Sequence, residues 1–217
     1  MKIKYGMQTI NIITKDIVYK IRWAYPIYLI TYSMLNNYDL ETKRKFKKGA
    51  YGLYKQHTET IKKIKDTDFL KEIFAIKKIS KFFITQEKVK MLYEYKDLDD
   101  TTFKEKINYF FDVNERLIQH GLAENSFNFG VNTGILNDMG VIVDFGELAT
   151  SKEEFINNVI NKKWEKQCNY RQLSERKKEI FSKEAMKRWN IDYINEIWGI
   201  KKSEKNDAKK GDKNVCR

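Results

Sequence analysis

The chain has 217 residues, 41% of them hydrophobic and 14% aromatic, which excludes an intrinsically disordered protein and leaves room for one domain or two small lobes. Its formal net charge of +12 is compatible with nucleic acid, nucleotides or acidic lipid surfaces, and equally with a generally lysine-rich sequence. The two cysteines, Cys168 and Cys216, lack the spacing of a metal site or a disulfide framework. The start, MKIKYGMQ, lacks the apolar segment of a signal peptide, and no apolar run approaches the length needed to cross a bilayer, so a cytoplasmic protein is expected.

The first predicted element is an antiparallel hairpin. Its strands are the runs 9–14 and 17–21, which are rich in β-branched residues. Alternation along the second strand predicts that Val18 and Lys20 lie on one face of it.

A long helix and two further strands are predicted next. The helical pattern covers residues 38–65, and the strand-like runs cover 79–85 and 89–93 with a turn at 86–88. The polar stretch 96–101 indicates a boundary between lobes. The stripe of the helix consists of Ala50, Leu53, Tyr54, His57, Ile61 and Ile64.

The second half of the chain is predicted to be mainly helical. A strong helix is expected at 102–119, with Thr101 or Thr102 placed to cap it. Its stripe consists of Phe103, Ile107, Phe110, Phe111, Asn114, Leu117 and Ile118. Further helices are expected at 151–164, 174–188 and 191–198, and core tryptophans at Trp164, Trp189 and Trp198. Strands first and helices afterwards predict an α+β fold rather than a doubly wound sheet.

The segment between these helices carries the most informative residues. Asn128 precedes a short predicted hairpin, and Asp144 ends the apolar strand 141–143 and is followed by Phe145 and Gly146. An amide oxygen and a carboxylate are hard ligands that suit Mg²⁺. The alternative interpretation is that both are ordinary turn residues.

This pattern resembles the catalytic loop and the D-F-G segment of the protein-kinase-like superfamily, over roughly residues 5–150. The style of the motifs is nearest to aminoglycoside-phosphotransferase-like kinases and to small bacterial or viral kinase-like proteins. The resemblance implies a two-lobed fold, ATP and Mg²⁺ as cofactors, and Asn128 and Asp144 as metal ligands. The expected parts are a sheet-containing lobe at 1–95, a reduced helical lobe at 96–200 and a basic disordered tail at 201–217.

The resemblance also implies a phosphate-binding lysine. Lys20 alternates with apolar residues, as the lysine of the third strand does in the small lobe of kinases. Glu59 is its expected partner, and Glu41 and Glu72 compete for that role. A solvated surface charge is the alternative for Glu59.

An adenine-binding strand is implied at residues 91–95, where Glu94 and Tyr95 would line the nucleotide. The alternative is a simple core strand. The glycine-rich phosphate loop of the family is absent, because only Gly6 precedes the second strand.

The catalytic loop departs from the family pattern. His120 and Gly121 resemble its start, but the place of the catalytic aspartate holds Leu122 when counted forward and Ala123 when counted back from the asparagine. Glu124 is the nearest carboxylate. It is either a substitute base or a surface charge, and the pattern favours the surface charge.

Three functions follow from this pattern. The first is an ATP- and Mg²⁺-binding kinase-like protein that transfers phosphate, or the nucleotide part, to a protein or a small-molecule acceptor. The second is a pseudokinase that acts as a binding or regulatory module. The third, a nucleic-acid-binding protein, is not favoured, because the lysines are spread along the chain rather than gathered on one helix.

Overall fold

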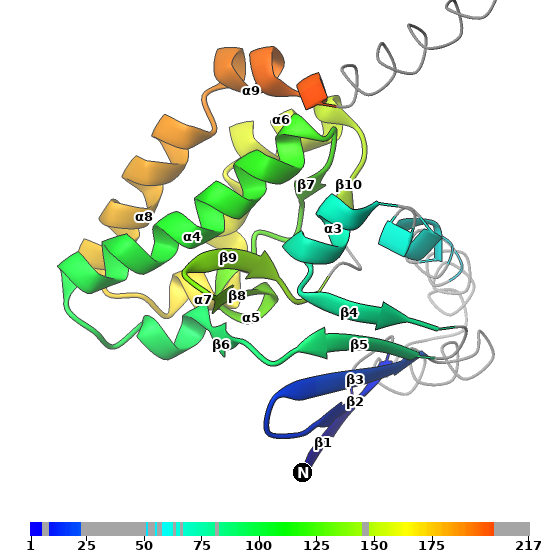
Figure 1. Cartoon of the computed structure of the whole chain (residues 1–217). Helices are drawn as coiled ribbons and strands as arrows, with labels where there is room; N and C mark the ends of the chain where they lie inside the picture. The colour runs from blue at the N-terminus through cyan, green and yellow to red at the C-terminus, as the bar shows by residue number, and fades with distance from the viewer. Residues whose placement is uncertain are drawn as a thin grey trace, which may run out of the picture. The chain divides into compact units, whose positions relative to one another are not determined.

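The computed structural model describes residues 1–5, 9–22, 51, 55, 58–62, 64–65, 67–80, 83–144 and 148–201. It has the predicted α+β class, with an antiparallel sheet and a set of helices (Figure 1). The chain divides into two compact units. The first is Met1–Lys90 with Val141–Glu147, and the second is Met91–Gly140 with Leu148–Arg217.

The first unit contains a five-stranded antiparallel sheet of order β1-β2-β3-β5-β4. Its strands are β1 (Lys2–Tyr5), β2 (Thr9–Ile13), β3 (Ile17–Arg22), β4 (Ile76–Ile79) and β5 (Phe83–Glu87). The predicted hairpin is confirmed, because β2 pairs with β3 and Asn11 lies opposite Lys20. The predicted alternation is also confirmed, since Val18 and Lys20 are partly buried and Tyr19 is exposed.

The second predicted pair of strands is wrong in position. Strands β4 and β5 pair antiparallel, and beyond this pairing the Ser80 backbone N–H donates to the carbonyl of Phe83 at 2.9 Å. Gln86 belongs to the predicted turn at 86–88, and this prediction is wrong. It lies inside β5, 2% exposed, and its amide Nε2 donates to the carbonyl oxygen of Phe74 at 2.8 Å. A satisfied amide can therefore occupy a buried strand position.

The predicted helix at 38–65 lies largely outside the described residues. The described part at 58–62 is helical, and Ile61 and Ile64 of the predicted stripe are buried. Helix α3 (Asp68–Ile73), which the sequence pattern did not reveal, follows and buries Leu70.

Helix α4 (Asp100–Gln119) of the second unit is confirmed together with its whole predicted stripe, which is buried. The predicted cap is wrong by a few residues. Asp99 is the N-cap, and its carboxylate accepts hydrogen bonds from the backbone N–H of Thr102 at 3.0 Å and from the hydroxyl of Thr102 at 2.7 Å. The carboxylate of Asp99 accepts both bonds at once, and its negative charge interacts favourably with the positive N-terminal end of the helix dipole. Asp99 is therefore a better cap than a threonine hydroxyl.

Shorter elements precede and follow α4 in the chain. They are β6 (Lys90–Met91), η1 (Leu92–Tyr95), β7 (Ala123–Glu124), α5 (Phe129–Asn132), β8 (Thr133–Leu136), β9 (Met139–Ile142) and β10 (Leu148–Ala149). The predicted hairpin after residue 128 is confirmed as β8 and β9, which belong to a three-stranded sheet of order β6-β8-β9. The predicted strand 89–93 is wrong beyond Met91. The carboxylate of Glu94 accepts the Met91 N–H at 3.2 Å, and the chain turns into a 3₁₀ helix.

The remaining elements are α6 (Lys152–Ile160), η2 (Lys163–Lys166), α7 (Cys168–Arg171), α8 (Glu175–Arg188) and α9 (Ile191–Ile197). Ser151 and Ser174, which begin two of the predicted helices, are the N-caps of α6 and α8, and each accepts a backbone N–H three residues later. The helix predicted at 151–164 ends at Ile160 instead, because Lys162 adopts a left-handed conformation with φ 46°.

An aromatic cluster forms the core of the second unit. Trp189 lies at its centre, with ring centroids 5.0 Å from Phe111, 5.1 Å from Phe127 and 5.4 Å from Trp164. The predicted core role of the tryptophans is confirmed, with Trp198 partly buried against the cluster. In the described part of the chain, no helix is both long enough and apolar enough to span a membrane.

Candidate functional site

Lys20 contacts the segment that follows β9, within the first unit. Its ammonium donates to the carbonyl oxygen of Val143, and Gln86 Nε2 donates to the same oxygen at 3.3 Å. Burial lowers the pKa of Lys20 from its usual value, and the negative charge of Asp144 partly opposes this lowering. The structure therefore brings together two residues, Lys20 and Asp144, that the sequence had proposed for one site.

Asp144 lies at the end of a buried segment. Val141 and Ile142 are buried, whereas Asp144 is exposed. A carboxylate that emerges from an apolar strand next to a partly buried ammonium suits a Mg²⁺ ion that carries phosphates. Phe145 and Gly146 lie outside the described residues.

The expected partners of Lys20 are placed as follows. Glu59 is exposed, and its Oε1 lies 3.9 Å from the ammonium of Lys55. Glu72 is exposed in α3, and Glu41 lies outside the described residues. The pairing of Lys20 with Glu59 stays a prediction.

The segment proposed to line the adenine forms the 3₁₀ helix η1 in place of an extended strand. Glu94 is exposed, and its carboxylate is used to hold the Met91 N–H. Tyr95 is the last residue of this helix, and its side chain is not among the described parts of the structure. Their contact with a nucleotide stays a prediction.

The structure places Glu124 in an environment that differs from the predicted one. The favoured interpretation as a surface charge is wrong, because Glu124 is only 1% exposed. Its Oε2 accepts the Phe127 N–H at 2.8 Å. Its Oε1 accepts the Ser126 N–H at 3.2 Å, the Ser126 hydroxyl, and Asn132 Nδ2 at 3.3 Å. Burial raises the pKa of Glu124 to about 7, and the hydrogen bonds from Ser126, Asn132 and Phe127 work in the opposite direction.

These contacts make Glu124 the organiser of its own loop. Leu122 and Ala123, at the position of the family's catalytic aspartate, are buried, and β7 pairs with β10 at Ala123 and Glu124. Both carboxylate oxygens of Glu124 are occupied by donors from the next eight residues. A buried carboxylate whose two oxygens accept hydrogen bonds from its own loop is a structural group.

Asn128 is linked to this loop and to α7. Its backbone N–H donates to Ser126 Oγ at 3.1 Å, and its side-chain oxygen accepts a hydrogen bond from Asn169 Nδ2. Asn169 also packs over Gly130, where an added Cβ would lie 2.8 Å from its Cγ. The sequence analysis missed Asn169, because nothing local marks a residue in a short helix as a partner of one 41 positions earlier. Asn128 belongs to the second unit and Asp144 to the first, so joint binding of a metal ion by both stays a prediction.

A second polar network fixes the same loop from α6 and η2. Asn125 donates to Glu154 Oε1 at 2.6 Å and accepts from Asn158 at 2.7 Å, and Lys163 donates to the carbonyl oxygen of Asn125 at 2.8 Å. The loop that presents Asn128 is therefore held on several sides by satisfied hydrogen bonds.

Among the described residues, no three His, Cys, Asp or Glu side chains gather as a metal-binding cluster. Comparisons with protein-family models, with curated proteins and with solved structures found no match to this chain.

Proposed function

We propose that this protein is a kinase-like protein of two lobes that binds ATP together with Mg²⁺. One observation carries the proposal: the ammonium of Lys20 on β3 donates to the backbone next to Asp144, 123 residues later in the chain. A triphosphate with Mg²⁺ needs a cation for its oxygens and a carboxylate for the metal ion, and these two residues supply both groups.

The chemistry of Lys20 suits a phosphate ligand. A partly buried ammonium is destabilised by the loss of hydration, so an incoming anion would recover free energy there. The Val143 carbonyl would keep its bond from Gln86 when Lys20 turns toward the phosphates. Asp144 would bind the Mg²⁺ ion, and Asn128 is proposed as the second protein ligand.

Calorimetric titration with ATP, in the presence and absence of Mg²⁺, tests this proposal. The variants are Asp144→Ala and Lys20→Met. Asp16→Ala and Lys15→Met serve as matched controls, because both residues are exposed in the turn between β2 and β3. Mg²⁺-dependent binding should weaken on the order of tenfold or more in the two site variants and stay unchanged in the controls. Equal affinity in all five proteins, or no binding by the wild type, would reject the proposal.

A second candidate, a pseudokinase that binds nucleotide without turning it over, is favoured by the state of Glu124. Its two oxygens are occupied within a buried loop, and Leu122 and Ala123 offer no proton acceptor. Incubation with ATP labelled at the α- or the γ-phosphate separates the two candidates, because label transfer or ATP hydrolysis reports either kind of turnover. Binding without any product selects the pseudokinase. Turnover that is lost in Asp144→Ala selects the enzyme.

A further inference from the structure

The sheet of the first unit has two faces of different character. Lys20 lies on one of them, and side chains alternate along a strand, so its neighbours Tyr19 and Ile21 lie on the other. The strand register extends this second face, because Ile12 of β2 lies opposite Tyr19 and Ile3 of β1 lies opposite Ile12. We call it the isoleucine face, and it consists of Ile3, Ile10, Ile12, Tyr19 and Ile21.

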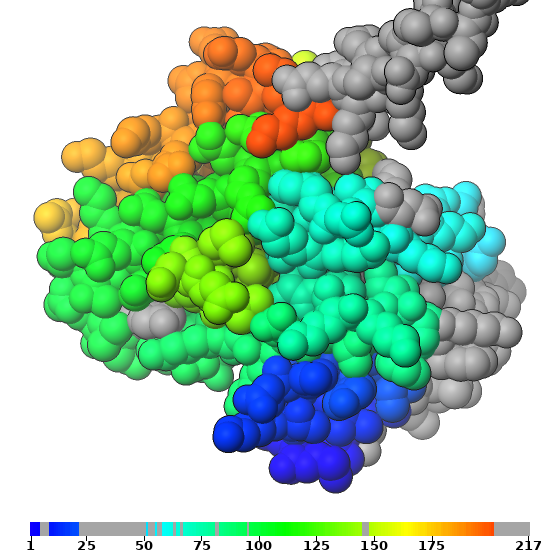
Figure 2. Space-filling model, viewed as in Figure 1, coloured from blue at the N-terminus to red at the C-terminus, as the bar shows by residue number. Residues whose placement is uncertain are grey.

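The isoleucine face is open to solvent. Ile3 is 48% exposed, and Tyr19 and Ile21 are each 37% exposed. Figure 2 shows atoms of β1, β2 and β3, in blue, at the surface. A contiguous apolar patch that is left exposed on a folded protein marks a site of interaction with a partner or a membrane.

Positive charge is concentrated in the same sheet. The segments 1–22 and 76–90, which contain its five strands, have ten Lys and Arg residues against two Asp and Glu residues. They therefore carry a net charge of +8, out of +12 for the whole chain. Of the two carboxylates, Glu87 pairs with Lys77 at 3.5 Å, and Asp16 is exposed in the turn between β2 and β3. Pairing within these segments cannot cancel such an excess of cations.

Unpaired lysines lie at the borders of the isoleucine face. The strands β1 and β4 are the two edges of the sheet. Lys2 and Lys4 flank Ile3 on β1, and Lys78 of β4 lies opposite Thr85, which in turn lies opposite Tyr19. The exposed lysines that form no ion pair with any described residue are Lys2, Lys4, Lys15, Lys78 and Lys88. The sheet thus has an apolar centre between two cationic edges.

We propose that the isoleucine face binds the surface of a membrane that contains anionic lipids. The apolar side chains would enter the boundary between headgroups and acyl chains, and the lysines would contact the acidic headgroups. Because the lysines lie on opposite edges of an open sheet, their charges are dispersed around the apolar centre, which suits a fluid lipid surface better than a single protein segment. The proposal is independent of nucleotide binding, since Lys20 lies on the other face.

Two other occupants fit this face less well. A second copy of the chain would bring together two surfaces of the same strong positive charge. Single-stranded nucleic acid stacks its bases on aromatic rings, and Tyr19 is the one exposed aromatic side chain among the described residues of this face. The isoleucines would then gain nothing from the interaction.

Co-sedimentation of the full chain with vesicles measures this interaction. One set of vesicles is phosphatidylcholine alone, and the other is phosphatidylcholine mixed with phosphatidylserine. Ile3→Thr with Ile21→Thr removes apolar surface and keeps β-branched side chains that suit a strand. Lys2→Glu with Lys4→Glu reverses the charge of the β1 edge.

Matched controls come from the second unit. They are Ile160→Thr with Met186→Thr, at positions 59% and 57% exposed, and Lys183→Glu with Lys187→Glu, at exposed positions of α8. If circular dichroism shows that a double substitution in the sheet disturbs folding, Ile3→Thr alone or Lys2→Ala with Lys4→Ala replaces it. A labelled single-stranded oligonucleotide represents the other class of polyanion.

The wild type and both controls should bind the vesicles with phosphatidylserine alike, with an affinity that falls as salt rises. Binding should be on the order of tenfold weaker for phosphatidylcholine alone, and weaker by a similar factor for each of the two sheet variants. Absence of vesicle binding, equal binding to both kinds of vesicle, or wild-type binding by either sheet variant would overturn the proposal. Oligonucleotide binding that the lysine reversal weakens, without binding to vesicles, would overturn it and assign the sheet to nucleic acid.

Discussion

The ammonium of Lys20 and the backbone carbonyl of Val143 form a hydrogen bond that joins β3 to the segment after β9. This carbonyl has a second donor, Gln86 Nε2, at 3.3 Å. The lysine is therefore not needed to satisfy the Val143 carbonyl, and its burial lowers its own pKa. A charged group that is held at a cost to stability, where the backbone does not require it, is typical of a binding site.

Lys20→Met is accordingly expected to raise the unfolding free energy of the ligand-free protein at pH 7 while it weakens Mg²⁺-dependent ATP binding on the order of tenfold or more. The sign follows from the lowered pKa of Lys20. The unfolded chain binds the proton more tightly than the folded chain, so the stability linked to this group is lost as the pH falls through the folded pKa. Urea unfolding at pH 7 and at pH 10 measures the effect, and the gain from Lys20→Met should be smaller at pH 10.

Lys15→Met is the control for that comparison, because Lys15 is exposed in the turn before β3. It should leave both stability and ATP affinity unchanged. A loss of stability in Lys20→Met at pH 7 would show that the hydrogen bond to Val143 outweighs the cost of burial.

Glu124 is expected to make the stability of the second unit depend on pH. Burial raises the pKa of Glu124 from the usual 4.5 to about 7, so the folded state holds the proton more tightly than the unfolded state does. The associated stabilisation is complete below pH 4.5 and is lost as the pH rises to about 7. The slope approaches about 1.4 kcal/mol per pH unit in that window.

Glu124→Gln should remove this pH dependence. The glutamine amide has one oxygen that accepts hydrogen bonds and one nitrogen that cannot, whereas donors, including the Phe127 N–H, now face both carboxylate oxygens. Some donors therefore lose their acceptor, and the unfolding free energy is expected to fall by about 1–3 kcal/mol at pH 5. The difference from wild type should shrink by pH 8. Urea unfolding across this range checks it, with Glu105→Gln, an exposed position on α4, as the control. Parallel curves for wild type and Glu124→Gln would contradict the assignment.

Periodic patterns explain what the sequence could predict. The stripe of α4 from Phe103 to Ile118 repeats at helical spacing, and the β2–β3 hairpin alternates around a polar turn, so both were identified correctly. At Gln86 the sequence pattern gave a wrong prediction. The sequence predicts a turn there, but the amide is buried in β5, where it donates to the carbonyl oxygens of Phe74 and Val143.

The environment of Glu124 could not be predicted for a related reason. Its donors come from Ser126, Phe127 and Asn132, and their convergence depends on a loop conformation that includes a left-handed Phe127, with φ 56°. No periodic pattern encodes such a loop. The association of Lys20 with the segment at Asp144 was anticipated only through the resemblance to kinases, since local patterns cannot reveal a contact across 123 residues.

In the turn between β8 and β9, glycine at position 138 is expected to give a more stable protein than the aspartate found there. Asn137 and Asp138 have φ 49° and 55°, the left-handed pair of a two-residue type I′ hairpin turn. Asp138→Gly removes the steric cost of that conformation and should stabilise the protein by about 0.5–1 kcal/mol. Asp138→Val should destabilise it by about 1 kcal/mol or more. Urea unfolding measures both. Asp97→Gly, at an exposed position without a positive φ, is the control and should not stabilise.

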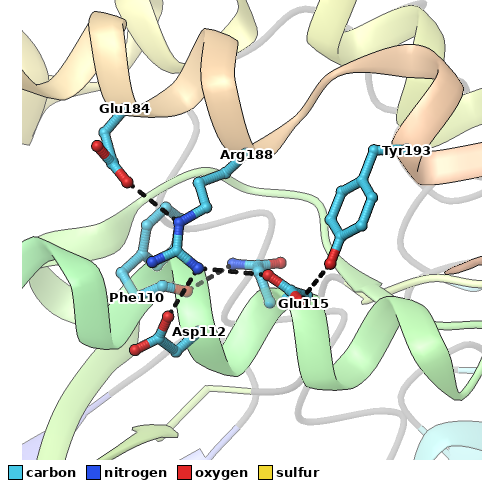
Figure 3. Close-up of polar contacts among 7 residues, drawn as sticks. Phe110, Asp112, Glu115, Glu184, Arg188 and Tyr193 are labelled. Carbon is cyan, nitrogen blue, oxygen red and sulfur yellow. Dashed lines mark hydrogen bonds and ion pairs between the residues drawn. The ribbon is translucent and has the colours of Figure 1, made fainter.

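Arg188 is expected to be the most sensitive charged residue on the surface of the second unit. Its guanidinium lies 2.9 Å from Asp112, 3.3 Å from Glu115 and 3.1 Å from Glu184, and Tyr193 donates to Glu115 at 2.6 Å (Figure 3). Arg188→Met leaves three carboxylates near one another without a cation, so a loss of about 1–3 kcal/mol is expected at pH 7.

Glu184→Gln should restore part of the lost stability in the double variant, because it removes one of the three carboxylates. Urea unfolding of the single and double variants measures both effects. Arg176→Met is the matched control on the same helix. Arg176 is 70% exposed, and exposed ion pairs contribute little, so this substitution should cost less than about 1 kcal/mol. Equal losses for the two arginines would show that the bonds of Arg188 to α4 do not hold α8 in place.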